Sequence, residues 1–183
     1  MHIHIRELGR LDRASLEPHF LALDGEDRRL RFGIPLNNDA VRAYAARIDF
    51  ERDAVFGFYD DALHLVGAAH VARGGGHAEL GVSVLPGHRG RGIGGALLAR
   101  AHLRARNWGV RALFMHCLTE NAAMMHLARR QDMEIVAESG EADAWLRLSP
   151  ADASSHFGEV FQQRVALFDY ALKQGRAWLS QGR

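Results

Sequence analysis

The sequence predicts an α/β (α+β) fold, in which one domain of strands and helices is followed by a helical extension. Segments whose apolar residues alternate or run continuously, as in strands, are interleaved with segments of helical spacing. Several strand-like segments are separated only by short turns rich in aspartate or glycine, which is typical of antiparallel hairpins. After Pro150 the pattern changes to one apolar stripe at helical spacing. We therefore expect a domain over residues 1–149 and a helical extension over residues 150–183.

Length, composition and charge narrow the class of protein. The chain has 183 residues, of which 48% are hydrophobic and 25% charged, as in ordinary globular domains. The formal net charge of +1 gives no indication of a nucleic-acid-binding surface. No apolar run approaches the ~20 residues that span a membrane, and the N-terminus lacks the apolar core of a signal peptide. We expect a cytoplasmic protein with no nucleic-acid partner and no membrane partner.

Cysteine and histidine usage argues against disulfide and metal sites. The single cysteine, Cys117, excludes an internal disulfide and a cysteine-based zinc site. It ends a strand-like segment, where a free cysteine usually packs in the core instead of acting as a nucleophile. The 11 histidines show no His-Glu-x-x-His or comparable spacing, so no metal is expected.

The first fifty residues contain one predicted strand and two predicted helices. Residues His2–Leu8 alternate with period two and predict the strand. Asp12–Leu23 and Asn38–Ile48 have helical spacing, with Asp12 as the cap of the first helix and Asn37 or Asn38 as the cap of the second. Between the two helices, the strongly charged stretch Asp24–Phe32 is expected to form a solvated loop.

The middle of the chain predicts most of a sheet. Its strand-like segments turn at Asp60-Asp61, at a triple glycine beginning at Gly74 and around Gly140. The continuous apolar character of one segment, Ala112–Leu118, predicts a central buried strand. The other predicted strands are Ala54–Tyr59, Leu63–Val71, Ala78–Leu85, Glu134–Glu138 and Ala144–Leu148, and the predicted helices are Gly94–Trp108 and Asn121–Arg130.

The C-terminal segment carries a single apolar stripe. Its members are Phe157, Phe161, Val165, Phe168 and Leu172. Such stripes mostly face the core of their own domain, so we expect a helix that docks on the domain. The alternative is a contact between two copies, so the chain is expected to be a monomer or a homodimer.

The most informative segment joins a predicted strand to the next helix through a glycine-rich turn. Backbone N–H groups at the turn and at the start of the helix have no intrahelical partners, and the helix dipole adds positive potential. Gly90, Gly92 and Gly94 let the backbone approach a phosphate without Cβ clashes. Arg89 and Arg91 add charged donors. The segment therefore predicts an anion-binding site.

Three kinds of phosphate ligand compete for this site. A P-loop needs Gly-Lys-Ser/Thr, but Ile93 follows the second glycine and the only lysine, Lys173, lies far along the chain. The pattern Gly90-x-Gly92-x-x-Gly95 matches the dinucleotide fingerprint, yet no acid ends the next strand as that fingerprint requires. A dinucleotide stays an alternative ligand, and coenzyme A is the third candidate.

The motif Arg89-x-x-Gly92-x-Gly94 resembles the Arg/Gln-x-x-Gly-x-Gly/Ala signature of the GNAT N-acetyltransferase superfamily. The Val82-x-Val84 strand before it, the Leu97-Leu98 helix after it and the later Asn121-led helix fit the same family. The resemblance spans roughly residues 2–148. It is closest to bacterial GNAT domains of the protein-lysine-acetyltransferase type, to which the stretches 27–32, 47–52 and 120–128 look similar.

The resemblance implies a mixed, mainly antiparallel sheet that is flanked by helices and splayed between its fourth and fifth strands. Acetyl-CoA would enter the splay, with its pantetheine amides on the backbone of Val82 and Val84 and its pyrophosphate on the glycine-rich turn. The backbone N–H of Val82 or Ser83 would hold the oxyanion. The residues implied to bind acetyl-CoA are Val82, Ser83, Val84, Arg89, Gly90, Arg91, Gly92, Ile93, Gly94 and Asn121.

The reaction implied by the resemblance is transfer of an acetyl group from acetyl-CoA to a primary amine by direct attack. Glu79 matches the family's usual glutamate and is the implied general base. Ala128 stands where many relatives carry a tyrosine that protonates the departing thiolate, so a catalytically silent acyl-CoA-binding protein is the alternative. The acceptor is a protein lysine or a small amine. In the family the stretch 24–32 covers the acceptor groove, where Glu26 and Asp27 would meet a cationic amine.

Overall fold

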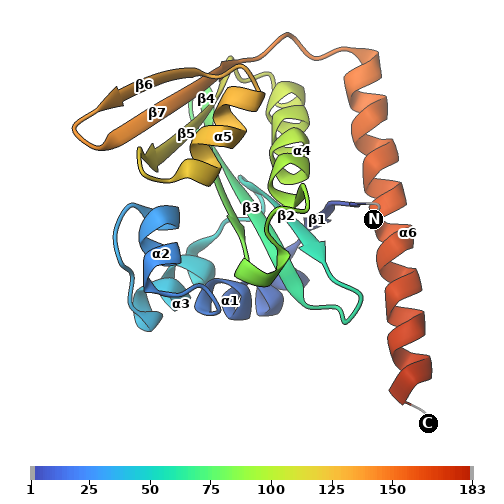
Figure 1. Cartoon of the computed structure of the whole chain (residues 1–183). Coiled ribbons are helices and arrows are strands. Elements are labelled where there is room, and N and C mark those ends of the chain that lie inside the picture. Colours follow the sequence, from blue (N-terminus) through green and yellow to red (C-terminus); the bar gives the residue numbers. More distant parts are fainter. Residues whose placement is uncertain (1–2, 182–183) are drawn as a thin grey trace.

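A seven-stranded sheet forms the centre of the structure, which is a computed structural model that describes residues 3–181 (Figure 1). The strands lie in the order β1-β2-β3-β4-β5-β7-β6. Their bounds are Arg6–Leu8 for β1, Ala54–Tyr59 for β2, Leu65–Arg73 for β3, His77–Val84 for β4, Ala112–Leu118 for β5, Glu134–Glu138 for β6 and Glu141–Arg147 for β7. The helices are α1 (Arg13–Leu21), α2 (Gly25–Phe32), α3 (Asn38–Arg47), α4 (Ile93–Asn107), α5 (Ala122–Arg130) and α6 (Ala153–Gln181), with short 3-10 helices at Arg10–Asp12 and Pro86–His88.

All neighbouring strands pair antiparallel except β4 and β5. These two strands pair in parallel over only three positions, His77–Glu79 against Ala112–Phe114. The rest of β4, residues 80–84, stays paired with β3 but has no partner on its other edge. The predicted mixed sheet, split between its fourth and fifth strands, is therefore confirmed.

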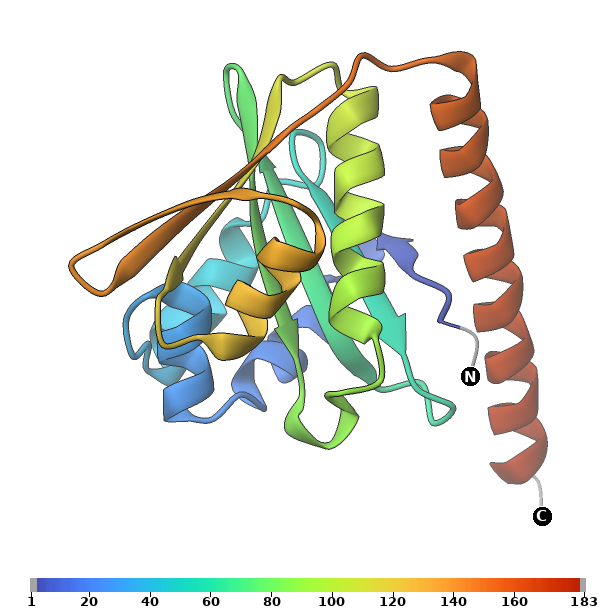
Figure 2. The ribbon, with the colours of Figure 1, turned by 45° about the horizontal axis from the view of Figure 1, so that its top comes forward.

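Helices cover both faces of the sheet, because alternate strand residues point to opposite sides. On one face α1 and α3 pack through Leu16, Phe20 and Val41 in a cluster with Val55 of β2. On the other face α4 packs through Leu97 and Leu98, and α5 lies beside it (Figure 2). The cluster on this second face also contains Phe56, Leu80, Val82, Leu113 and Ala128.

The charged stretch 24–32 is a helix, so the predicted loop is wrong. The Asp24 side chain accepts a hydrogen bond from the Asp27 N–H at 2.8 Å and caps α2, and Gly33 ends it with a φ of 78°. None of the residues of α2 is buried. Without a buried face the helix has no apolar periodicity, and only its capping residues indicated it.

Other element boundaries differ in small ways. The first predicted strand shrinks to β1, and its first residue, His2, lies outside the described residues. Asp12 precedes α1, but its carboxylate binds the Gly9 N–H and Arg6 instead of capping the helix. The strand β5 has the predicted bounds, but only alternate residues are buried, so it is not buried on both faces as predicted. On its less buried face, Phe114 packs on Trp145 with ring centroids 4.4 Å apart.

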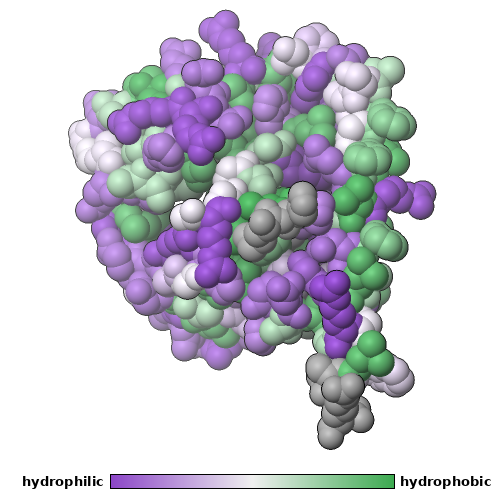
Figure 3. All heavy atoms as spheres, turned by 45° about the vertical axis from the view of Figure 1, so that its right-hand side comes forward, coloured by the Kyte–Doolittle hydropathy of each residue, from purple (hydrophilic) through white to green (hydrophobic). Residues whose placement is uncertain are grey.

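The C-terminal helix α6 docks on the domain through a polar face. Glu159 pairs with Arg100 and Arg104 of α4, and Lys173 donates to the Tyr59 carbonyl at 2.9 Å. Most of the predicted apolar stripe points the other way, with Phe157 72% and Phe168 68% exposed (Figure 3). Only its member Val165 is half-buried, and it lines a small cavity with Ile3 and Ala96. The expectation that this stripe docks on its own domain is wrong for its exposed members, because α4 offers α6 the guanidinium groups of Arg100 and Arg104 and not an apolar groove. The division of the chain at residue 150 stays a prediction.

The end of α5 stores backbone strain at Asp132. The Met133 N–H donates to the Ala128 carbonyl and the Asp132 N–H to the Arg129 carbonyl, which is the Schellman arrangement. That arrangement puts Asp132 at a φ of 51°, in the left-handed region that glycine occupies without cost.

We predict that Asp132→Gly raises the free energy of unfolding by about 0.5–1 kcal/mol, because it relieves this strain. Urea titration followed by circular dichroism measures the change. The control Asp39→Gly, in the first turn of α3, should lower the same quantity by up to about 1 kcal/mol. A loss of stability for Asp132→Gly would contradict the prediction.

Candidate active site

A cavity of about 670 Å³ opens where β4 loses its second partner. Its walls come from β4, the turn before α4, the first turn of α4, the length of α5 and one side of α2. Of the predicted site residues, Val82, Ser83, Val84, Arg89, Gly90, Gly92, Ile93, Gly94 and Asn121 line it, whereas Glu79 and Arg91 do not. Residues that the sequence did not single out also line it, among them Leu30, Arg31, Met124, Leu127 and Arg130.

The unpaired edge of β4 presents backbone groups to this cavity. The Leu85 N–H donates to Val66 of β3, whereas the Val84 carbonyl accepts from Arg89 Nε at 2.9 Å. Because N–H and C=O groups of one residue share an edge and alternate along the strand, Val82 and Val84 face the cavity and Ser83 faces β3. An extended ligand with amide groups can therefore pair with Val82 and Val84 as an added strand.

The start of α4 presents a second set of backbone donors. Gly92 is the N-cap with a φ of 85° and provides no side-chain cap, and Gly90 has a φ of 71°. The first helical bond runs from the Ala96 N–H to the Gly92 carbonyl, so the N–H groups of residues 93–95 point out of the helix without intrahelical partners. Together with the helix dipole, they form a cradle for an anionic group such as a diphosphate.

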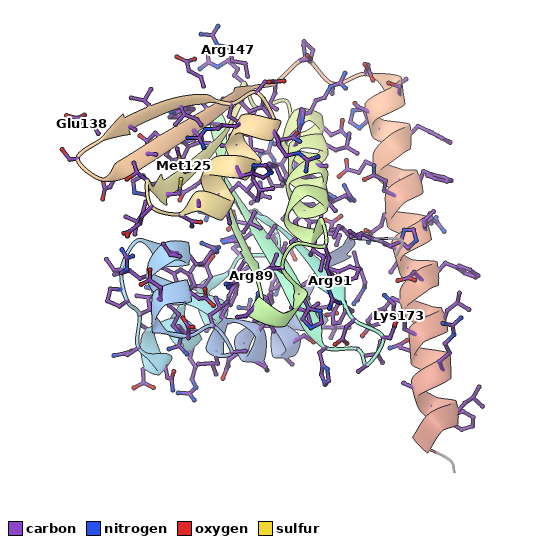
Figure 4. All side chains as sticks on the ribbon, viewed as in Figure 1. Arg89, Arg91, Met125, Glu138, Arg147 and Lys173 are labelled. Atoms are coloured by element: carbon purple, nitrogen blue, oxygen red, sulfur yellow. The ribbon has the colours of Figure 1, made fainter. Side chains whose placement is uncertain are left out.

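Two arginines flank this cradle differently (Figure 4). Arg89 bridges the Val84 carbonyl and the Asp27 carboxylate, which lies 2.7 Å from its guanidinium. Arg91 is exposed. Arg89 pairs with Asp27 and Arg29 pairs with Glu26, each at 2.7 Å, so both carboxylates have arginine partners in this structure. The predicted contact of these carboxylates with a cationic amine stays a prediction.

Glu79 lies at the point where β4 and β5 part. It is the last residue of β4 that pairs with β5, opposite Phe114, and it is exposed. Its side chain shares a face of β4 with Gly81 and Ser83, the face toward α1 and α2. A carboxylate at this position lies beside the deep end of the unpaired edge.

Arg31 of α2 packs directly against the unpaired part of β4, at Gly81. A Cβ atom at Gly81 would lie only 2.2 Å from its guanidinium carbon, so glycine is required there. Arg31 donates to the Tyr44 hydroxyl at 3.1 Å and forms no ion pair with a described carboxylate, and its Nε has no hydrogen-bond partner. In the sequence, Arg31 is one of several arginines in the stretch 24–32, which in the GNAT superfamily covers the acceptor groove. Nothing in the sequence distinguished it from the others.

A hydrogen-bonded chain supports Arg31 from behind. Tyr44 donates to His70 Nδ1 at 2.8 Å, and His70 Nε2 donates to Asp53 at 3.0 Å. Burial lowers the pKa of His70, so its ring is neutral at pH 7. Burial raises the pKa of Asp53, but hydrogen bonds from Arg52, His70 and the Arg73 N–H outweigh it and hold this pKa below its usual value.

The Ser83 hydroxyl is directed away from the unpaired edge. His19 of α1 is 2% exposed and must donate through Nδ1 to the Leu65 carbonyl, which lies 2.9 Å away. Its Nε2 therefore accepts the Ser83 hydroxyl proton at 2.8 Å. Burial is the main cause that lowers the pKa of His19 to about 4.

Asn121, Cys117 and Ala128 each have contacts within the fold, and the predicted role of Asn121 in binding stays a prediction. The Asn121 side chain caps α5 through the Met124 N–H and ties α2 to α5 through the Leu30 carbonyl. Cys117 is 3% exposed against Met125, and burial raises the pKa of its thiol, which disfavours a nucleophilic role. Ala128 is fully buried and has no proton to donate.

Within residues 3–181, no group of three histidine, cysteine or acidic side chains is arranged to hold a metal ion. The helices in this part of the chain also include none that is long and apolar enough to cross a bilayer.

Comparison with known proteins identifies relatives of this architecture. The model of the acetyltransferase (GNAT) family matches residues 18–133. The GNAT domain of an S. lividans PAT protein superposes with a TM-score of 0.68 and 21% identity, over 80% of this chain and 90% of that one. No curated protein sequence matches the chain.

Two further structures in this group are described as containing acetyl-CoA. The putative acetyltransferase yncA of Salmonella typhimurium has a TM-score of 0.61 and 18% identity, over 84% of this chain and 98% of that one. A phosphinothricin acetyltransferase of Sinorhizobium meliloti has a TM-score of 0.65 and 17% identity, over 84% and 95%.

The buried, neutral His19 predicts a pH-dependent stability. Its pKa in the folded state, about 4, lies below the unfolded value of 6.5, so the unfolded chain binds a proton more readily. Stability is then complete above pH 6.5 and is lost as the pH falls toward 4. Between pH 7 and pH 5, His19 alone should lower the free energy of unfolding by about 2 kcal/mol.

Urea titrations at the two pH values measure this loss, and His70 and His102 add to it because their pKa values are also lowered. His19→Asn keeps a donor for the Leu65 carbonyl but cannot be protonated, so its stability should fall less over the same range. An equal fall in both proteins would contradict the assignment.

Proposed function

The chain belongs to the acetyltransferase (GNAT) family, and we propose that it transfers an acetyl group from acetyl-CoA to a primary amine. The observation that carries this proposal is the cavity along the unpaired edge of β4, which leads directly into the uncapped first turn of α4. One end suits the amide-containing arm of a thioester carrier, and the other suits its diphosphate.

The residues present fit acetyl-CoA as follows. The backbone of Val82 and Val84 would pair with the pantetheine amides, and the donors of residues 93–95 would hold the diphosphate, with Arg91 at the rim. Pairing at Val84 requires Arg89 to release the Val84 carbonyl, which leaves its guanidinium available to the phosphates.

Glu79 would act as the general base. An alkylammonium has a pKa near ~10.4, so only about one amine in 2,500 is nucleophilic at pH 7. The amine nitrogen attacks the thioester carbonyl carbon, its proton passes through water to the Glu79 carboxylate, and the C–S bond breaks as the C–N bond remains. The Val82 N–H, which faces the cavity, is the oxyanion donor that this geometry favours over Ser83.

The thiolate would leave without a protein acid. Ala128 occupies the position of the family tyrosine, and the thiol of the leaving group has a pKa near ~8.5, so its thiolate is a tolerable leaving group near neutral pH. Because this position lacks a proton donor, a catalytically silent acyl-CoA-binding protein is the alternative. The rate of thiol release from acetyl-CoA distinguishes the two.

The acceptor is a protein lysine side chain or a small amine, and the positive charge of Arg31 bears on which small amines can bind. Its guanidinium, which forms no ion pair with a described carboxylate, lies against β4 at Gly81, two residues along the strand from Glu79. A cation at this place favours an amine that carries a carboxylate or another anionic group, and disfavours polyamines. The sequence resemblance to protein-lysine acetyltransferases favours the peptide instead.

The proposal is tested by thiol release from acetyl-CoA with a panel of an amino acid, a polyamine and a lysine-containing peptide. Turnover with one class establishes the activity and names the acceptor. Tight CoA binding with no turnover of any class would support the silent protein, and a melting temperature raised by NAD but not by CoA would support a dinucleotide ligand.

We predict that Glu79→Gln lowers kcat by about 100-fold or more at pH 7, because the amine proton loses its acceptor. The KM for acetyl-CoA should change little. The deficit should narrow as the pH rises toward the pKa of the amine, since the free amine then needs no base. Glu138→Gln, at the distant tip of the β6–β7 hairpin (Figure 4), is the matched control, and equal turnover by all three proteins would overturn the base assignment.

We predict that Gly92→Val weakens CoA binding at least about tenfold in isothermal titration calorimetry. A β-branched residue is not tolerated at a φ of 85°, so the donors at the start of α4 lose their orientation. Gly87→Val, in the short helix before the turn, meets nothing within 4 Å and serves as the control. Unchanged affinity in a folded Gly92→Val protein would remove the turn from the site.

A further inference from the structure

The helix α6 is amphipathic, but it turns its polar face to the domain and its apolar face to solvent, the opposite of an ordinary surface helix. Its inner face, against the domain, is mostly polar, while its outer face is apolar and exposed (Figure 3). We call the following residues the outer face: Phe157, Val160, Phe161, Arg164, Leu167, Phe168, Ala171, Leu172, Gly175, Trp178 and Leu179. The eight large apolar members are 42–77% exposed, and Arg164 is the only charged member.

The inner face fixes the orientation of the helix. Glu159 accepts from Arg104 and from Arg100, whose side chain is 2% exposed, and the Gln163 side chain accepts the Glu7 N–H at 3.1 Å. Turning the outer face inward would break these bonds and leave the buried Arg100 without its carboxylate, which is strongly unfavourable. The apolar face therefore cannot be covered by the protein's own domain.

The four exposed aromatic residues alone supply most of the apolar area that a protein interface requires. Phe157, Phe161, Phe168 and Trp178 are 72%, 59%, 68% and 77% exposed, and alone they present about 550 Å² if a free aromatic ring offers about 200 Å². The four aliphatic residues add to this area. A standard interface buries about 800 Å² per partner, and the largest apolar patch of a monomer is about 300–600 Å².

We propose that the outer face of α6 binds the outer face of α6 in a second copy, as an antiparallel pair about a two-fold axis. Steps of four and three residues connect Phe157, Phe161, Arg164, Phe168, Ala171, Gly175 and Trp178, the spacing of a seam between two helices. The helix has 29 residues and is about 43 Å long, so two copies can pair over many turns.

The order of side chains along this seam favours the antiparallel arrangement. With Phe168 at the axis, Phe161 lies opposite Gly175 of the partner subunit, so a large side chain meets the smallest one. Arg164 then lies opposite small or apolar residues. A parallel pair in register would instead place Arg164 against Arg164 and glycine against glycine, which combines charge repulsion with a gap.

A lipid surface fits the same face less well. A helix that lies in a bilayer interface presents lysine and arginine from its polar face to the headgroups. In α6 the domain covers most of the polar face, and Lys173 is bound to Asp169 and the Tyr59 carbonyl. The two exposed arginines, Arg164 and Arg176, do not form a basic face of their own. The second copy is therefore the occupant that the charges favour.

Light scattering coupled to size-exclusion chromatography tests the proposal on the full chain. Wild type should elute at micromolar concentration with twice the chain mass of 20.3 kDa, and Phe161→Glu/Phe168→Glu with the chain mass. Val136→Glu, which adds the same charge at another exposed apolar residue, on β6, should stay dimeric. A monomeric wild type, or a dimer that survives the double substitution, would overturn the proposal.

Cysteine cross-linking tests the antiparallel arrangement in a Cys117→Ala background. Phe168→Cys, at the axis, should oxidise to a disulfide-linked dimer, whereas Trp178→Cys alone should not. Cross-linking of Trp178→Cys and not of Phe168→Cys would overturn the arrangement. A monomer that co-sediments with phosphatidylcholine–phosphatidylserine vesicles through α6 would overturn the dimer and assign the face to lipid.

Discussion

The separation of β4 from β5 after three paired positions is the constraint on which the site depends. The strand β5 continues with β7 over all its length, and β4 continues with β3, so the two halves of the sheet diverge. Unpaired strand edges invite other strands, and here the helices α4 and α5 restrict access to the exposed edge. Because of this divergence, the backbone of Val82 and Val84 and the first turn of α4 line one cavity, and Glu79 marks the last paired position before the strands part.

The part of the site that could be predicted from sequence is the part made by the main chain. Gly90 and Gly92 indicate a turn with positive φ, and the strand before it and the helix after it follow from apolar spacing. The side-chain contacts of the site could not be predicted from the sequence. His19 meets Ser83 and Arg31 meets Gly81 across more than forty residues of sequence, and no local pattern records such contacts. The helix α2 was missed because it buries no residue.

The C-terminal helix shows a different limit of sequence patterns. An apolar stripe indicates that a helix has a face to cover, but not which surface covers it. The decisive residues lie elsewhere, in Arg100 and Arg104 of α4, which take up Glu159 and so fix the polar face inward. Two arginines on one helix thus decide the orientation of another that begins about fifty residues later.

The ion pairs of Arg100 connect the two ends of the chain. This buried cation has carboxylates near it from Glu7, at the start of the chain, and from Glu159, near its end. Because α6 supplies Glu159 and also packs on α4, its docking brings the closer of these two carboxylates to Arg100. A residue in the middle of the chain thus joins the first strand to the last helix.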